Sequence, residues 1–251
     1  MRLRFRDVGS GAPVLLLHAF PLEGEMFEPQ WSALSGRARL IVPDLRGFGG
    51  SSVGPGPSEM GVMADDVLAL LDHLGVASAV VGGVSMGGYA SLALLRNDPG
   101  RVRALVLADT KTAADDAQGR EGRERTAQEV LVTGSTALLP LVDRLLGPAA
   151  PAALRARVSG WISSGSPEGL AAALRGMALR PDSRDILARF GGPVLVVVGT
   201  DDVMTPPAKA RAMADLVPGA EMVEIPGAGH LPNLEQPEAF NAALGRFLGR
   251  M

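Results

Sequence analysis

Short apolar segments recur along this chain, each bounded by turn-forming or charged residues. Continuous apolar runs of this length are typical of strands buried on both faces of a parallel sheet, because half-exposed strands alternate and helices are usually longer. Five such runs cover residues 13–19, 39–44, 78–85, 102–109 and 193–199. We expect a sixth strand at 220–227 and a polar, antiparallel edge strand at 3–9.

Helical patterns lie between these runs. The segment 58–75 opens on Ser58 in a cap-like sequence, closes on Gly75 and carries apolar residues in helical spacing. We expect further helices at 205–219, which begins with a threonine and two prolines, and at 236–251. Strands that alternate with helices predict a doubly wound, mostly parallel α/β sheet.

One long interval, residues 111–189, contains no strand-like run. It is far longer than the usual connection between a strand and a helix. We interpret it as a helical cap inserted over the strand ends, with a separately packed subdomain as the alternative. The predicted core domain then comprises residues 1–110 and 190–251.

The sequence GGVSMGG at 82–88 joins a predicted strand directly to a predicted helix. Glycines allow the backbone to fold back within a few residues, which would hold Ser85 at the apex of the turn. A second match to the same pattern, GSSVG at 50–54, lies in a Gly/Pro/Ser-rich stretch without flanking elements. Ser85 is therefore predicted to be a nucleophile and Ser52 a loop residue.

A serine nucleophile needs a base, and the chain has three histidines. His73 lies at the end of a predicted helix, which favours a structural role. His18 ends a strand next to the sequence AFP and is expected to orient that loop. His230 lies in a glycine-rich loop after the last strand, where a base can approach Ser85, so we predict that it is the base.

The base in turn needs a carboxylate, and three aspartates follow strand ends. Asp202, Asp201 and Asp109 are all candidates, because open α/β sheets react at the carboxyl ends of their strands. Asp44 is expected to fix its own turn.

An oxyanion formed in the reaction would need N–H donors, and we assign the amides of Met86 and Phe20 to that role. Met86 follows the nucleophile at the start of a helix, and Phe20 lies in the loop after the strand at 13–19. The residues that we expect to line the substrate pocket are His18, Trp161, Val203 and Leu231.

Composition excludes several functional classes. The absence of cysteine rules out disulfides, thiolate nucleophiles and cysteine-based zinc sites. A net charge of −3 without a basic cluster argues against nucleic-acid binding. The N-terminal apolar run is too short for a membrane span or signal peptide, so we expect a cytoplasmic protein. The predicted serine chemistry implies neither a cofactor nor a metal.

Five ordered motifs carry a resemblance that covers essentially the whole chain. They are LLHAFPL (16–22), PDLRGFGGS (43–51), GGVSMGG (82–88), VGTDDVMTPP (198–207) and GAGHLPNLEQPEAF (227–240). With these motifs the chain resembles enzymes of the α/β-hydrolase fold, which implies that the acid is Asp202, three residues after Gly199, and that the base is His230. Ala19 departs from the glycine that usually follows the histidine in this family.

Within that family the chain is similar to bacterial carboxylesterases and to 3-oxoadipate enol-lactonase-like proteins. The resemblance implies a serine hydrolase that cleaves small carboxylic esters through an acyl-enzyme. An enol-lactone substrate is the first alternative, and its carboxylate would require an inward-facing arginine such as Arg175 or Arg180. A ligand-binding protein without turnover is a second alternative, and perhydrolase or carbon–carbon cleavage on the same residues is a third.

Overall fold

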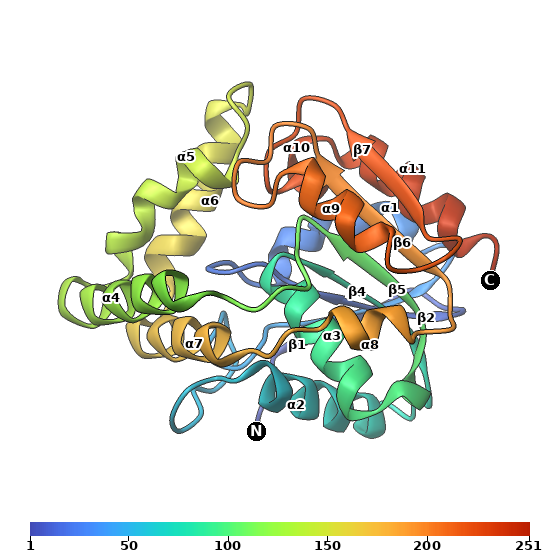
Figure 1. The fold of residues 1–251 in the computed structure, drawn as a ribbon, viewed down its shortest axis with the longest axis horizontal. Coiled ribbons are helices and arrows are strands. Elements are labelled where there is room, and N and C mark those ends of the chain that lie inside the picture. The colour runs from blue at the N-terminus through green and yellow to red at the C-terminus, as the bar shows by residue number, and fades with distance from the viewer.

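A seven-stranded, mostly parallel sheet forms the centre of the protein in a computed structural model that describes residues 1–251 (Figure 1). The strand order is β1-β3-β2-β4-β5-β6-β7, and only β1 runs antiparallel to its neighbour. The strands are β1 (Phe5–Val8), β2 (Pro13–Leu17), β3 (Arg39–Pro43), β4 (Ala79–Val84), β5 (Val102–Ala108), β6 (Val194–Gly199) and β7 (Glu221–Ile225). All seven predicted strands are present, and the predicted fold class is confirmed.

Helices pack against both faces of this sheet (Figure 1). The core helices are η1 (Gly24–Phe27), α1 (Glu28–Leu34), α2 (Met60–His73), α3 (Met86–Asn97), η2 (Pro99–Arg101), α9 (Pro207–Ala214), α10 (Pro232–Glu235) and α11 (Pro237–Leu248). Helix α3 contacts α2, β4 and β5, whereas α1 contacts α11. The predicted start at Ser58 is wrong, because α2 begins at Met60 and its N-cap residue, Glu59, makes no side-chain capping bond. No helix combines the length and the apolar character needed to cross a membrane.

The interval between β5 and β6 contains helices only. They are α4 (Ala117–Thr133), η3 (Ser135–Leu141), α5 (Val142–Leu145), α6 (Ala152–Ser164), α7 (Pro167–Leu179) and α8 (Arg184–Ala188). Helices α4 to α7 lie to one side of the sheet, with α4 packed against α7 (Figure 1). Helix α8 instead contacts α3, and Arg96 of α3 donates a hydrogen bond to the carbonyl of Asp182 just before α8. The end of the interval thus packs on the core.

A buried carboxylate joins the two places where the chain crosses between the core and these helices. Asp115 precedes α4 and accepts hydrogen bonds from Lys111, Arg123 and Arg180, the last of which follows α7. The side chains of Asp115 and Arg180 are only 5% and 4% exposed. Arg180 also donates to the carbonyls of Ala113 and Met177. Together with the backbone hydrogen bond from Ser183 to Thr112, this pair holds the incoming and outgoing segments together.

The turn from β4 into α3 has no room for side chains at two glycines. A Cβ on Gly83 would lie 2.1 Å from the carbonyl carbon of Gly87, and one on Gly87 would lie 1.9 Å from the carbonyl oxygen of Leu17. Ser85, between them, has φ 54° and ψ −112°, a conformation that non-glycine residues rarely adopt. The close approach of these backbones forces the turn and leaves Ser85 at its apex.

We predict that Gly87→Ala destabilises the protein by about 1–3 kcal/mol, because the new Cβ overlaps the β2 backbone. Activity should fall with it, because the serine next to the displaced backbone moves. Gly61→Ala is the matched control: its Cβ would meet nothing closer than 3.9 Å, and its stability should stay within about 1 kcal/mol of the parent. Urea unfolding of both variants measures the difference.

Replacing Asp115 with asparagine leaves three cations with one neutral partner. We expect a loss of about 3 kcal/mol in the free energy of unfolding, because breaking a buried ion pair leaves uncompensated charge. Glu121→Gln removes an exposed pair with Arg125 on the same helix and should cost less than about 0.5 kcal/mol. Equal losses in the two variants would show that Asp115 contributes no more than a surface ion pair.

Candidate active site

Ser85 is fixed by its own backbone at the carboxyl end of β4. Its N–H donates to the carbonyl of Ala108 at 2.9 Å, which continues the pairing of β4 with β5. Its carbonyl accepts the hydroxyl of Thr110 at 2.8 Å and the amides of Gly88 and Tyr89 at 2.9 and 3.3 Å. The residue is half-buried. The peptide on each side of the side chain is therefore held in place.

His230 and Asp202 are brought into direct contact by the loops that follow β7 and β6. His230 Nδ1 lies 2.8 Å from Asp202 Oδ2, and both side chains are almost completely buried. Thr205 donates its hydroxyl to the same oxygen at 2.6 Å, while Oδ1 accepts the amides of Met204 and Thr205. Burial alone would raise the pKa of Asp202, but the hydrogen bonds from His230 and Thr205 hold it well below its usual range. The carboxylate is thus ionised and can orient the imidazole.

The second ring nitrogen of His230 is free. Nε2 is buried and has no hydrogen-bond partner, and the hydroxyl of Ser85 makes no hydrogen bond to it in this structure. Because Nδ1 is held by Asp202, Nε2 is the nitrogen available to take up a proton. Hydrogen bonds of this kind often tighten only when substrate is bound.

Glu235 supports the loop that carries His230. Its Oε1 accepts the amides on either side of the histidine, from Gly229 at 2.9 Å and Leu231 at 3.3 Å. Its Oε2 accepts the amide of Gly147, between α5 and α6, at 2.7 Å. Burial raises the pKa of Glu235, and these three amides oppose that rise. The amide of His230 itself donates to the carbonyl of Leu145 in the same inserted segment.

The sequence analysis missed Thr205 and Glu235. Each lies within a quoted motif, three residues after Asp202 and five after His230 respectively. Those spacings are the only signal, since neither residue type by itself indicates a contact with the site.

The other candidate acids are engaged elsewhere. Asp201 is exposed, and its carboxylate accepts the hydroxyl of Thr200. Asp109 is buried, and its Oδ1 accepts the amide of Gly199 at 2.9 Å. Of the three aspartates, only Asp202 has a hydrogen bond to His230.

The two predicted oxyanion donors have free amides. Met86 is the first residue of α3, so its N–H has no acceptor within the helix. The N–H of Phe20 makes no hydrogen bond, whereas the preceding amide, of Ala19, donates to the sulfur of Met26 at 3.2 Å. The ring of Phe20 meets Phe48 edge to face, with centroids 6.2 Å apart.

The four residues predicted to line the pocket differ in exposure. Val203 is 64% exposed and Trp161 is half-buried, with Arg157 stacked on its ring, whereas His18 and Leu231 have no accessible surface. His18 accepts the amide of Leu45 on Nε2 at 2.9 Å, and its Nδ1 lies 3.0 Å from the carbonyl of Ala19. Burial lowers the pKa of this histidine. These contacts agree with the predicted loop-orienting role of His18.

The remaining predicted residues lie away from this constellation. His73 ends α2 and is exposed, Ser52 is exposed in a loop, and Asp44 accepts the amides of Gly24 and Gly50.

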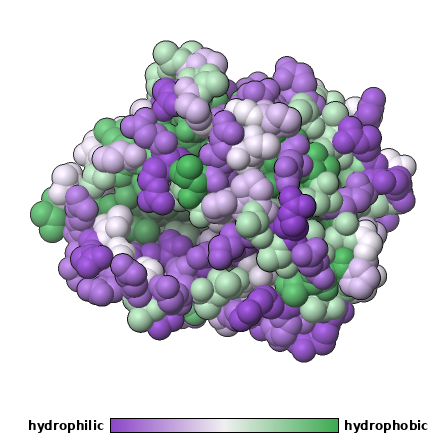
Figure 2. Space-filling model, turned by 45° about the horizontal axis from the view of Figure 1, so that its top comes forward, coloured by the Kyte–Doolittle hydropathy of each residue, from purple (hydrophilic) through white to green (hydrophobic).

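Figure 2 shows a hollow in the face that contains the inserted helices, with hydrophobic residues at its base.

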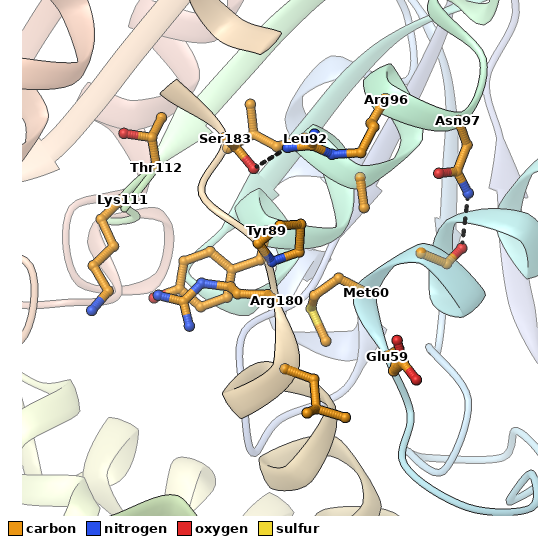
Figure 3. Close-up of a pocket in the computed structure, with 14 residues that line it drawn as sticks. Glu59, Met60, Tyr89, Leu92, Arg96, Asn97, Lys111, Thr112, Arg180 and Ser183 are labelled. Carbon is orange, nitrogen blue, oxygen red and sulfur yellow. Dashed lines mark hydrogen bonds between the residues drawn. The ribbon is translucent and has the colours of Figure 1, made fainter. Parts of the chain in front are cut away.

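A separate cavity of about 140 Å³ lies between α2, α3 and the segment that follows α7 (Figure 3). Tyr89 of α3 is in its wall, with the guanidinium of Arg180 4.0 Å from the ring centroid. Lys111 and Arg96 also line it, and Arg96 donates to the hydroxyl of Ser183. Ser85, Asp202 and His230 are not part of this lining. The cavity is therefore distinct from the constellation around Ser85.

Asp109, Asp202 and His230 form a cluster of potential metal ligands, with one atom of each within 4.8 Å of the others. Both oxygens of Asp202 already accept two hydrogen bonds each, and one of these comes from His230 Nδ1. The groups that contact Asp202 in this cluster are N–H and O–H donors, so the carboxylate is bound through protons rather than through a cation.

Comparison with known proteins places this geometry in context. A family model described as alpha/beta hydrolase fold matches residues 12–237. A 3-oxoadipate enol-lactonase of Acinetobacter baylyi is 30% identical over 227 residues, covering 90% of this chain and 84% of the relative.

Two solved structures are also similar. A thermophilic esterase from Thermogutta terrifontis, with malate bound, has a TM-score of 0.97 and 42% identity, covering 99% of this chain and 93% of its own. The enol-lactonase of Burkholderia xenovorans has a TM-score of 0.90 and 29% identity, covering 98% and 96%. The seven-stranded sheet and the extent of the family match lead to one conclusion: this chain belongs to the alpha/beta hydrolase fold family.

Proposed function

We propose that the protein is a serine hydrolase that cleaves small carboxylic esters with Ser85, His230 and Asp202. The observation that carries this proposal is the 2.8 Å contact between Asp202 Oδ2 and His230 Nδ1, which leaves Nε2 as an unpartnered base. Ser85 directly follows β4, which is the neighbour of β5 in the sheet, so its hydroxyl lies at the same edge of the sheet as the loops that carry Asp202 and His230.

In this mechanism the hydroxyl of Ser85 attacks the ester carbonyl while His230 Nε2 takes its proton. The amides of Met86 and Phe20 donate to the negatively charged oxygen of the tetrahedral intermediate. His230 then gives the proton to the leaving alcohol, and an acyl-enzyme remains. Water, deprotonated by the same histidine, attacks the acyl group and releases the acid and Ser85. Asp202 stays ionised and stabilises the imidazolium that forms twice in the cycle.

The inserted segment 111–189 is proposed to act as a cap over the substrate. Support comes from its position on one side of the sheet and from the contact of its Leu145 carbonyl with the amide of His230 (Figure 1). The esterase and enol-lactonase relatives support a carboxylic-ester or lactone substrate. A hydrophobic base in the hollow of Figure 2 suits an apolar acyl or alcohol group.

Enol-lactone hydrolysis is the second candidate, favoured by the two enol-lactonase relatives. A carboxylate-bearing substrate needs an available cation. Arg175 is paired with both oxygens of Glu124 at 2.8 and 2.9 Å, and Arg180 with both oxygens of Asp115. Since neither predicted arginine is free, we place neutral esters first.

Ser85→Ala should lower kcat for p-nitrophenyl butyrate by at least about 10³-fold, because no other hydroxyl can form the acyl-enzyme. Ser52→Ala removes the serine of the second glycine-flanked match and should leave kcat unchanged. Turnover by Ser85→Ala within tenfold of the parent would refute the mechanism. A single burst of p-nitrophenol from the parent without steady turnover would instead indicate a ligand-binding protein.

Substrate charge distinguishes the two candidate reactions. We expect kcat/KM for a neutral ester, p-nitrophenyl butyrate, to exceed that for the mono-p-nitrophenyl ester of succinate by about tenfold or more, because the anion would be desolvated without a partner. Steady-state assays of both esters beside the enol-lactone measure this. A strong preference for the anionic substrates would favour the lactonase.

A further inference from the structure

Asp109 is a buried carboxyl group for which the mechanism above has no use. It directly follows β5, is 1% exposed, and belongs to the cluster in which one ligand atom each of Asp109, Asp202 and His230 lie within 4.8 Å of one another. Its φ of 45° makes it, with Ser85, one of two non-glycine residues with a positive φ. Strained backbone of this kind persists where the surrounding structure fixes it, and such positions cluster at functional sites.

The two oxygens of Asp109 have different surroundings. Oδ1 accepts the amide of Gly199, the last residue of β6, at 2.9 Å. Oδ2 is buried and has no donor. A buried, ionised carboxylate oxygen without a donor destabilises the folded state, whereas the O–H of a carboxylic acid can donate to a neighbouring acceptor. The ionised Asp202 belongs to the same cluster, and its negative charge makes an uncharged Asp109 the favourable form.

Electrostatics agrees with that geometry. Burial raises the pKa of Asp109 well above its usual range, and the charge of Asp202 raises it further. The amide of Gly199 opposes these two effects, because its N–H favours the charged form of the carboxyl group. Two adjacent carboxyl groups that share one proton carry one negative charge between them.

We propose that Asp109 is a positioning residue, a second carboxyl group that donates a hydrogen bond from Oδ2 to Asp202 and so supports the Asp202–His230 pair. The proposal rests on the function proposed above. It has a second consequence: when the carboxylate of Asp202 is removed, Asp109 is the only carboxyl group of the cluster left beside His230, and it can lose its proton and orient the imidazole in part.

The experiment compares Asp109→Asn in two backgrounds, the parent and Asp202→Ala. Asparagine keeps an acceptor for Gly199 and replaces the O–H donor with an N–H donor, but it cannot become charged. Asp202→Ala removes the carboxylate without introducing an amide that would hold the wrong imidazole tautomer. Thermal unfolding checks that each variant is folded, and Asp202→Ser is the second background if Asp202→Ala does not fold.

We expect Asp109→Asn to lower kcat by about two- to threefold in the parent but by at least about tenfold in the Asp202→Ala background, with KM for p-nitrophenyl butyrate little changed in both. Asp109→Leu, which can neither donate nor accept, should lower kcat by about tenfold or more in the parent. A smaller loss of kcat in Asp109→Asn than in Asp109→Leu would indicate that the hydrogen bond is what position 109 contributes.

Equal effects of Asp109→Asn in the two backgrounds would overturn the proposal, because a structural residue has no reason to matter more when Asp202 is absent. A loss in the parent as large as that of Asp109→Leu would also overturn it, since a charged Asp109 would then be required. Failure of the proposed function gives a different result: Ser85→Ala and Asp202→Ala would then retain parental turnover whatever residue occupies position 109.

Discussion

The contact of the Gly87 backbone with the β2 carbonyl of Leu17 is the constraint on which this site depends. A Cβ would not fit at Gly87 or at Gly83, and glycine has none. The two glycines therefore allow the chain to turn from β4 into α3 in the space of one residue. That turn determines three things together: the strained conformation of Ser85, the free amide of Met86 at the helix start, and the distance of the serine from β5. The positions of the candidate nucleophile, Ser85, and of one candidate oxyanion donor, Met86, thus both follow from this close approach of two backbones.

Parallel pairing explains why residues far apart in sequence meet at this turn. Strands β4, β5, β6 and β7 are consecutive neighbours in the sheet, so the loops after them emerge at one edge. Asp109, Asp202 and His230 lie in these loops, one, three and five residues after the ends of β5, β6 and β7 respectively. A hydrogen bond from the Gly199 amide to Asp109 links the ends of β5 and β6. The order of the strands in the sheet therefore brings these three residues close together.

Much of this arrangement could be predicted from sequence because it depends on local pattern. Apolar runs predicted the central strands, the polar segment 3–9 predicted the antiparallel edge strand β1, and glycine placement predicted the turn at Ser85. The contacts of Arg180, Asp115 and Glu235 could not be predicted, because a charged residue in a helical segment has the same pattern whether it is solvated or buried in an ion pair. Asp201 and Asp202 are neighbours with equal claims from position alone. The resemblance to a known family favoured Asp202, and in the folded loop Asp202 is the one that contacts His230.

The inserted helices are joined to the core at two places with different chemistry. At the chain crossings, Asp115 and Arg180 form a buried ion pair that also stacks on Tyr89, one helical turn after Ser85. At the other place, Glu235 binds the amide of Gly147 and the amides that flank His230 with the same carboxylate. A displacement of the segment around Gly147 would therefore remove a partner from Glu235 and from the His230 amide at once. The position of these helices and that of His230 are therefore linked through Glu235 and through the hydrogen bond from the His230 amide to the Leu145 carbonyl.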